Sequence, residues 1–298
     1  NIMSFEVNFD GLVGPTHNYA GLSHGNLHSV NNKSKPSNPC EAALQGLDKM
    51  KMMYDLGYKQ CIIPPQERPL LSGYDDYQNM AINASASSMW VANSSTIAPS
   101  ADTKNNKLNL LTANLNFTHH RRIEAPQTHT ILNKIFNDTS KFLIHSPLDS
   151  DGELDDEGAA NHTRFCNSYE EEGLHFFVYG RSQNDSEENP TKYPARQTLE
   201  ASQKVAENLQ IKNVVFAQQS AESIDAGVFH HDVIGVGNKN LYFYHENALA
   251  EEAETIAKLQ DSFNGTINFM CVKEHQVPMN LAVDTYLFNS QLVEYKGG

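Results

Sequence analysis

Four short segments combine chemically active side chains with glycine or proline, residues that shape the backbone for a close approach to a ligand. They are residues 14–26 (GPTHNYAGLSHGN), 156–162 (DEGAANH), 193–197 (YPARQ) and 225–232 (DAGVFHHD). Together they hold carboxylates, imidazoles and a guanidinium. These groups can transfer protons and bind a charged small molecule.

The last two segments hold candidate acid, base and anion-binding groups. His230 and Asp232 alternate, so on an extended strand both would face one side, where the carboxylate could hold a cation while the imidazole moves protons. The alternative is a structural histidine at a strand end. Arg196, in a turn that begins with proline, and the run 119–122 offer bidentate donors for a carboxylate. A surface salt bridge is the alternative, and we favour it for Arg122.

Glu157 follows two aspartates and precedes a glycine. Crowded carboxylates raise one another's pKa, which can make one of them a proton donor. The alternative is that the acidic stretch 149–157 is a solvated loop.

The sequence gives little support for a metal site or for a paired-cysteine site. The side chains of metal-binding type match no ligand spacing, so we predict no metal; they are His17, His24, His28, His230 and Asp232. The cysteines lie far apart and form no CxxC pair, so we expect buried free thiols at Cys40, Cys61, Cys166 and Cys271.

Composition excludes further classes of partner. The 298 residues carry a formal charge of −14, which would repel the phosphates of a nucleic acid. No apolar run reaches the roughly 18 residues that a membrane span needs, and residues 1–4 show no signal-peptide pattern, so we predict a cytoplasmic protein without a membrane partner. No GxGxxG or GxxxxGK[ST] element indicates a dinucleotide or nucleoside triphosphate site.

Strand and helix patterns alternate along the chain, which predicts a mixed α/β fold. The clearest helix begins at the N-cap pair Asn38-Pro39 and ends at Gly57, before a buried strand at 61–63. A hairpin is expected from strands 233–236 and 241–244. The other predicted strands are 108–115, 174–179, 214–217 and 267–272, and the other predicted helices are 127–136, 198–209 and 247–263.

Longer motifs identify a family resemblance. The chain resembles the N-succinylarginine dihydrolases over nearly its whole length, with the motifs in family order. They are residues 6–14, 19–23, 89–93, 96–102, 113–116, 120–121, 156–162, 193–198, 216–219, 227–233 and 286–291.

The resemblance implies a pentein fold, a five-bladed α/β propeller with a central polar site, formed here by a single catalytic domain over residues 1–298. It also implies a homodimer and no cofactor. The expected reaction converts N2-succinylarginine and two waters to N2-succinylornithine, carbon dioxide and two ammonia molecules. A cysteine thiolate attacks the guanidinium carbon while histidine moves protons.

Motif matching implies roles for particular residues. Glu157 and His230 fall on catalytic positions. The positions that contact substrate are matched by Ala20, Gly21, Leu22, Ser23, His24, Gly25, Asn26, Leu27, His28, Ser29, Asn93, His120, Arg121, Arg196 and Asp232.

Two departures from the family pattern qualify this expectation. The family's nucleophilic cysteine follows the motif at 286–291, whereas no cysteine follows Cys271 here, so the domain is expected to be incomplete at its C-terminal end. The stretch between residues 67 and 88 is also shorter than in the family. A chain that binds succinylarginine without turnover, and another guanidine enzyme such as a deiminase or amidinotransferase, are the alternatives.

Overall fold

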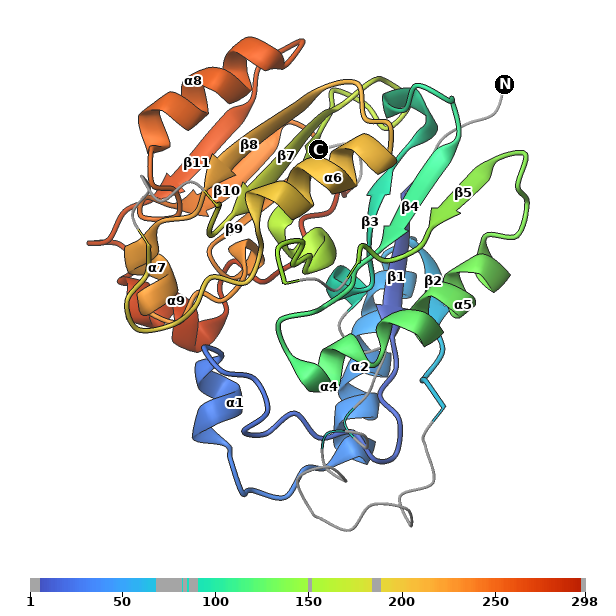
Figure 1. Ribbon diagram of the computed structural model, residues 1–298, viewed down its shortest axis with the longest axis vertical. Helices are drawn as coiled ribbons and strands as arrows, with labels where there is room; N and C mark the ends of the chain where they lie inside the picture. The colour runs from blue at the N-terminus through green and yellow to red at the C-terminus, as the bar shows by residue number, and fades with distance from the viewer. Residues whose placement is uncertain are drawn as a thin grey trace.

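The computed structural model describes residues 6–67, 82, 85, 91–149, 152–183 and 189–295. Within them the chain forms four β-sheets, with helices between the strands (Figure 1). The strands are β1 (Val7–Gly11), β2 (Lys59–Ile63), β3 (Ser95–Ala98), β4 (Leu108–Thr112), β5 (Phe142–His145), β6 (His162–Phe165), β7 (Leu174–Tyr179), β8 (Val214–Gln218), β9 (Gly235–Asn238), β10 (Leu241–His245) and β11 (Asn268–Val272).

The described helices are of two kinds. The α-helices are α1 (Leu27–Asn31), α2 (Pro39–Asp55), α4 (His119–Arg122), α5 (Ala125–Ile135), α6 (Leu199–Asn208), α7 (Ala221–Asp225), α8 (Glu252–Ser262) and α9 (Met279–Thr285). Short 3-10 helices are η2 (Val91–Asn93), η3 (Ser100–Asp102), η4 (Gly158–Asn161) and η5 (His231–Val233). None of these described helices is both long and apolar enough to cross a membrane.

Three of the sheets repeat one pattern. In β3-β4-β5, β6-β7-β8 and β9-β10-β11 the first two strands are antiparallel and the last two are parallel. A parallel pair needs a crossover, which α5, α6 and α8 supply. The fourth sheet pairs β1 with β2 in parallel, and α2 forms its crossover. The predicted α/β class is confirmed.

Capping residues set where the crossover helices begin. Asn38 accepts a hydrogen bond from the Glu41 amide at the start of α2, and Thr198 accepts one from the Ala201 amide at the start of α6. Both helices were predicted close to these bounds. The predicted helix 247–263 begins only at Glu252, because the Ala250 amide donates instead to the Gln218 carbonyl at the end of β8.

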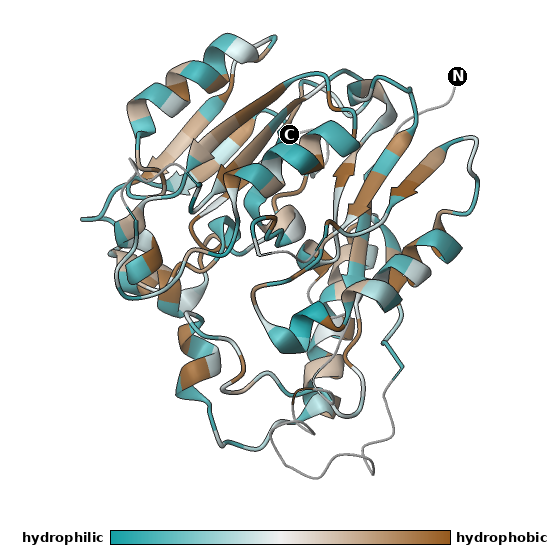
Figure 2. Ribbon diagram, viewed as in Figure 1, coloured by the Kyte–Doolittle hydropathy of each residue, from teal (hydrophilic) through white to brown (hydrophobic). Residues whose placement is uncertain are grey.

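The apolar core lies between the sheets and their crossover helices. One buried cluster joins β7 and β10 to α8, and a second joins β4 and β7 to α6. Figure 2 shows the hydrophobic residues concentrated in the strands, while the helices carry many polar residues. The prediction that the strand at 61–63 is buried is wrong in part, since Ile63 is buried but Ile62 is 45% exposed.

Two strand bounds differ from the prediction for local reasons. The strand expected at 233–236 begins only at Gly235, because residues 231–233 form η5. It does form the predicted hairpin, with Asn238 opposite Leu241. The strand expected at 108–115 ends at Thr112, because the Leu115 amide turns to the Asp156 carbonyl.

The cysteines are free, as predicted, but only Cys166 is buried; Cys40 is exposed, and Cys61 and Cys271 are half-buried. The prediction of buried thiols is therefore wrong for three of the four: Cys40 lies in the first turn of α2, and Cys61 and Cys271 lie on the edge strands β2 and β11. Residues 89–90 of one family motif, and most of the stretch between residues 67 and 88, lie outside the described residues.

Candidate active site

The repeated units bring distant polar residues together through their 3-10 helices. Helices η2, η4 and η5 each come directly before the first strand of a three-stranded sheet, and η4 contacts both η2 and η5. Asn93 lies in η2, Glu157 precedes η4, His230 precedes η5, and Asp232 lies within η5. The fold therefore gathers side chains from three units at one place.

The sequence argument for His230 and Asp232 was wrong in its geometry. They do not share the face of a strand, because His230 is the extended N-cap residue of η5 and Asp232 lies inside that 3-10 turn. Both nevertheless line the same cavity, and η5 contacts η4, the short helix that Glu157 precedes.

Glu157 and His230 form a buried pair. The Nε2 atom of His230 lies 2.6 Å from Oε2 of Glu157. Burial lowers the pKa of His230 even though Glu157 opposes this shift, so the imidazole is neutral near pH 7. Burial alone would raise the pKa of Glu157, but the hydrogen bond from His230 and the positive charges of Arg196 and Arg121 hold it below its usual value. The resulting pair is a carboxylate and a neutral imidazole.

The tautomer of this imidazole follows from its contact. Since Nε2–H donates to the carboxylate of Glu157, the other ring nitrogen, Nδ1, carries the lone pair that can accept a proton. His230 is thus prepared to act as a base and to become an acid after one transfer.

The acidic stretch is only partly the solvated loop that was the alternative reading. Glu153 is exposed, but Asp155, Asp156 and Glu157 are buried. Gly158 allows this close packing: its φ is +70°, and a Cβ there would lie 3.0 Å from the Ala92 carbonyl oxygen of η2.

Asp232 supplies a second carboxyl group. Its side chain is half-buried, and its Oδ1 atom, shielded from solvent, has no hydrogen-bond donor among the described residues. Desolvation raises its pKa to about 7, opposed by a hydrogen bond from Asn289. The buried Oε1 of Glu157 likewise has no described donor. Two acceptor oxygens of this kind suit a cationic ligand with several N–H groups.

Arg196 offers the opposite charge at the same cavity. Its guanidinium lies between the rings of Phe117 and Phe229, at 5.2 and 4.8 Å from their centroids. Its Nη2 donates to the Ser23 hydroxyl at 2.9 Å and to the His24 carbonyl at 2.6 Å. Burial lowers its pKa, but arginine stays charged. Its buried Nε has no acceptor among the described residues, which suits an anionic ligand group.

Helix α4 holds the remaining predicted pair. Arg121 bonds through Nε to Glu124 at 3.0 Å, and Arg122 is exposed, as expected. His120 is buried, and burial, together with the nearby positive charge of Arg121, lowers its pKa to about 3. His120 is therefore a neutral hydrogen-bonding group at this cavity.

These side chains surround a cavity of about 100 Å³. Both predicted catalytic residues and seven of the predicted substrate-contacting residues line it. The complete lining is Tyr19, Ser23, Asn26, Asn93, His120, Arg121, Glu157, Arg196, Phe229, His230, Asp232, Tyr286 and Asn289.

The other predicted residues of the loop 20–29 do not line this cavity, and their contacts support the loop instead. The Ser29 hydroxyl accepts from the Ser23 amide, Leu27 packs on the core, and the ring of His28 lies 4.6 Å from that of Tyr286. The predicted residues outside the lining are Ala20, Gly21, Leu22, His24, Gly25, Leu27, His28 and Ser29.

Four of the lining side chains were not predicted from the sequence: Tyr19, Phe229, Tyr286 and Asn289. All four lie in motifs that the sequence displays, but apolar or amide side chains give no sign of a ligand by type alone. Only their position next to charged residues could have indicated them.

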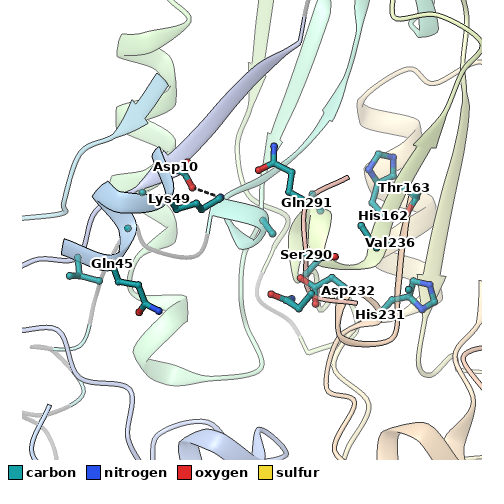
Figure 3. Close-up of a pocket in the computed structure, with 18 of the residues that line it drawn as sticks. Asp10, Gln45, Lys49, His162, Thr163, His231, Asp232, Val236, Ser290 and Gln291 are labelled. Atoms are coloured by element: carbon teal, nitrogen blue, oxygen red, sulfur yellow. Dashed lines mark hydrogen bonds and ion pairs between the residues drawn. The ribbon is translucent and has the colours of Figure 1, made fainter. Parts of the chain in front are cut away.

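A larger cavity of about 650 Å³ adjoins the first and shares Asp232 and Asn289 with it. Figure 3 shows it between the Asp10–Lys49 ion pair on one side and His162, His231 and Ser290 on the other. The smaller cavity is the candidate site, because it alone of the two contains the carboxylate–imidazole pair and Arg196.

Neither a thiol nor a metal cluster accompanies these groups. No cysteine lines the candidate site, and no three described histidine, cysteine or carboxylate side chains are grouped so as to hold a metal ion. Burial raises the pKa of both Cys166 and Cys271, which disfavours their thiolates.

The repeated sheets and the central polar cavity define a protein of the pentein class, and solved structures support that fold. An apo arginine dihydrolase from the ornithine-ammonia cycle in cyanobacteria matches at a TM-score of 0.58 with 16% identity, covering 96% of this chain and 33% of that one. A variant of DDAH from Pseudomonas aeruginosa, complexed with citrulline, matches at 0.52 with 11% identity, covering 92% and 78%.

The chain belongs to the succinylarginine dihydrolase family, whose model matches residues 3–298. An N-succinylarginine dihydrolase of Pseudomonas fluorescens is 50% identical over 319 residues, covering 99% of this chain and 71% of the relative. Since 319 aligned positions exceed the 298 residues of the chain, the chain has internal gaps relative to this protein.

Proposed function

We propose that the protein hydrolyses N2-succinylarginine with two waters to N2-succinylornithine, carbon dioxide and two ammonia molecules, a step of arginine catabolism in the arginine succinyltransferase pathway. The observation that carries this proposal is the single cavity lined by the Glu157–His230 pair, Asp232 and Arg196. The family membership of the chain supports the same reaction.

The charges of the cavity match the charges of this substrate. The unpaired oxygens of Glu157 and Asp232 would accept hydrogen bonds from its guanidinium group. Arg196, with its unpaired Nε, and Arg121 would bind carboxylates of its succinyl and amino-acid parts. Free arginine has one carboxylate fewer, so this arrangement favours the succinylated compound.

His230 then moves protons between successive steps. A thiolate adds to the guanidinium carbon, and ammonia leaves with a proton that His230 relays. Water hydrolyses the remaining amidino thioether with His230 as its base, which frees the thiolate and leaves a ureido product. A second round on that group releases the second ammonia and carbon dioxide.

None of the four cysteines in residues 1–298 lines the site, so none of them is placed to supply this thiolate. The chain matches 71% of the length of its relative, and we propose that the nucleophile belongs to the unmatched portion. Residues 1–298 would then supply the binding, orientation and proton-transfer groups of one catalytic domain. The alternative of binding without turnover remains an outcome of the substrate test below.

We also propose a cytoplasmic homodimer, which the family resemblance implies. The formal charge of −14 would repel a nucleic acid, which is consistent with a small molecule as the ligand.

Substrate discrimination tests the proposed function. The natural full-length protein is incubated with N2-succinylarginine, arginine and an N2-acetylarginine control, and ammonia is measured. We expect release from N2-succinylarginine, and a kcat/KM that is about 10- to 100-fold lower with arginine, because one charged hydrogen-bonded contact is worth roughly 1.5–3 kcal/mol. Equal rates with arginine would refute the substrate assignment. Binding without ammonia release would support the binding-only alternative.

The raised pKa of Asp232 leads us to expect that KM depends on pH. With a pKa of about 7, it becomes neutral as the pH falls, whereas a guanidinium needs the carboxylate. KM should therefore rise as the pH falls from about 8 to 6, approaching tenfold per pH unit below the pKa. The variant Asp232→Asn should have a high KM with little slope over this range. A wild-type KM that does not change with pH would contradict this role.

We expect the replacement of Arg196 to weaken substrate binding and to leave the chemical steps nearly unaffected. Its contact with a carboxylate would be present before and during the reaction alike, so Arg196→Ala should raise KM by about 10- to 100-fold and leave kcat within a few-fold. The exposed Arg122 is the matched control, and Arg122→Ala should leave both constants unchanged. A loss confined to kcat would show that Arg196 acts in another way.

A further inference from the structure

The backbone of Glu157 is held on both sides by buried amide side chains. Its N–H donates to Oε1 of Gln197 at 2.7 Å, and its carbonyl accepts from Nδ2 of Asn93 at 2.9 Å. Asn93 lines the candidate site, but Gln197 does not; its side chain is buried, 4% exposed, behind Glu157.

The orientation of the Gln197 amide is fixed by its other contacts. Its Nε2 donates to Oδ1 of Asp156 and to the Ser202 hydroxyl, each at 3.2 Å. The same Oδ1 accepts the Gly158 amide at 3.1 Å. Since a carboxylate cannot donate, the NH2 group of Gln197 must face Asp156, and its Oε1 must face the amide of Glu157. A flipped amide would lose these contacts.

Gln197 is also the next residue in the chain after the anion-binding residue Arg196. The backbone carbonyl of Gln197 accepts a hydrogen bond from the Gly180 amide at 3.0 Å. This bond anchors the turn to the end of β7. Arg196 presents a guanidinium to the cavity, and Gln197 accepts a hydrogen bond from the backbone N–H of Glu157. The turn therefore sets the position of both groups relative to one another.

We propose that Gln197 is a positioning residue, which holds Glu157 where its Oε2 meets Nε2 of His230 at 2.6 Å. Gln197 would not touch the substrate and would act only through Glu157. The inference rests on the proposed function for its kinetic consequences. A displacement of about 1 Å in a catalytic group can reduce turnover about a hundredfold, so the expected effect falls on kcat.

The kinetic experiment compares Gln197→Ala with Ser202→Ala in the natural full-length protein. Gln197→Ala should lower kcat for N2-succinylarginine by about 10- to 100-fold and change KM by less than about threefold. Ser202→Ala removes a different partner of the same Nε2 and leaves the bond to Glu157, so its kcat should stay within about twofold. Equal kcat values for Gln197→Ala and the wild type would overturn the proposal.

Gln197→Glu adds a pH signature that a merely structural role would not produce. It keeps an acceptor for the Glu157 amide but places a second carboxyl group against Asp156, and two such groups share a proton. The charged or titratable groups around them are Asp156, Glu157, His230, Arg196 and Arg121. As the pH falls from about 8.5 to 6.5, the added carboxyl should regain a proton to donate, so kcat relative to wild type should rise. A ratio that stays constant with pH would contradict the proposal.

A measurement without substrate separates this inference from the proposed function. The titration of the His230 imidazole is followed by NMR in the ligand-free protein. Loosening Glu157 weakens its raising effect on His230, so the imidazole pKa should fall in Gln197→Ala and stay unchanged in Ser202→Ala. If the wild type releases no ammonia from N2-succinylarginine, the proposed function is wrong, yet this titration still decides the role of Gln197; an unchanged pKa would overturn it.

Discussion

Replacing His230 with alanine is expected to abolish most ammonia release from N2-succinylarginine, with a fall in kcat of about 10²- to 10⁴-fold. His230 is the buried neutral base of the site, and proton transfer by such a group contributes about 10²- to 10⁴-fold. Binding of the product N2-succinylornithine, measured by calorimetry, should change by less than about fivefold. The pairing groups for that ligand are Arg196 and Arg121, which the substitution does not touch.

His231→Ala is the control for local damage in the same turn. His231 is buried, and its Nε2 lies 2.6 Å from the Tyr242 hydroxyl, away from the Glu157–His230 pair. Its loss should lower stability more than turnover. Retained activity in His230→Ala would remove His230 from the mechanism, and equal loss of activity in both folded variants would show that the effect is not specific.

The second large effect is on stability, where Asp102→Asn should reduce the free energy of unfolding by about 3–5 kcal/mol. Asp102 is fully buried and accepts from Arg164 at 2.5 and 2.9 Å, from His175 at 2.8 Å and from the Gly173 amide at 2.8 Å. These bonds join η3 of one unit to β6 and β7 of the next. Removing the charge leaves a largely buried arginine uncompensated, and this is the costly way to break such a pair.

The exposed pair of Asp138 and Lys141 is the matched control, and Asp138→Asn should leave the free energy of unfolding nearly unchanged in the same urea titration. Burial alone would raise the pKa of Asp102, but the bonds from His175 and Arg164 lower it strongly. The stabilisation is therefore present above the unfolded value near 3.8 and is lost as the pH falls below it. Equal losses for the two variants at pH 7 would contradict this assignment.

The regular elements were largely predictable because their signals are local. Asn38 and Thr198 are N-caps whose side chains take up the first free amides of α2 and α6, and both helices begin where these residues stand. The hairpin at Gly235–His245 follows from a polar tetrapeptide between two apolar runs. Such features depend on a few neighbouring residues, so they can be recognised in a single sequence.

The site was predictable in its members but not in its geometry. Glu157 and His230 are 73 positions apart, and only the repeated placement of η4 and η5 before their strands brings them to 2.6 Å. No periodicity in the sequence indicates a three-residue 3-10 turn, so only an extended strand was considered as the means of placing His230 and Asp232 on one face. Tyr286 and Asn289 escaped because nothing in their type distinguishes a cavity wall from a surface.

The stoichiometry of the reaction is the measurement that tests the central claim most directly. The natural full-length protein is given N2-succinylarginine to completion, ammonia is counted, and the products are identified by mass spectrometry. We expect two ammonia molecules for each N2-succinylornithine formed, with carbon dioxide as the remaining product. One ammonia with an accumulating ureido product, or no ammonia at all, would contradict dihydrolase chemistry at this site.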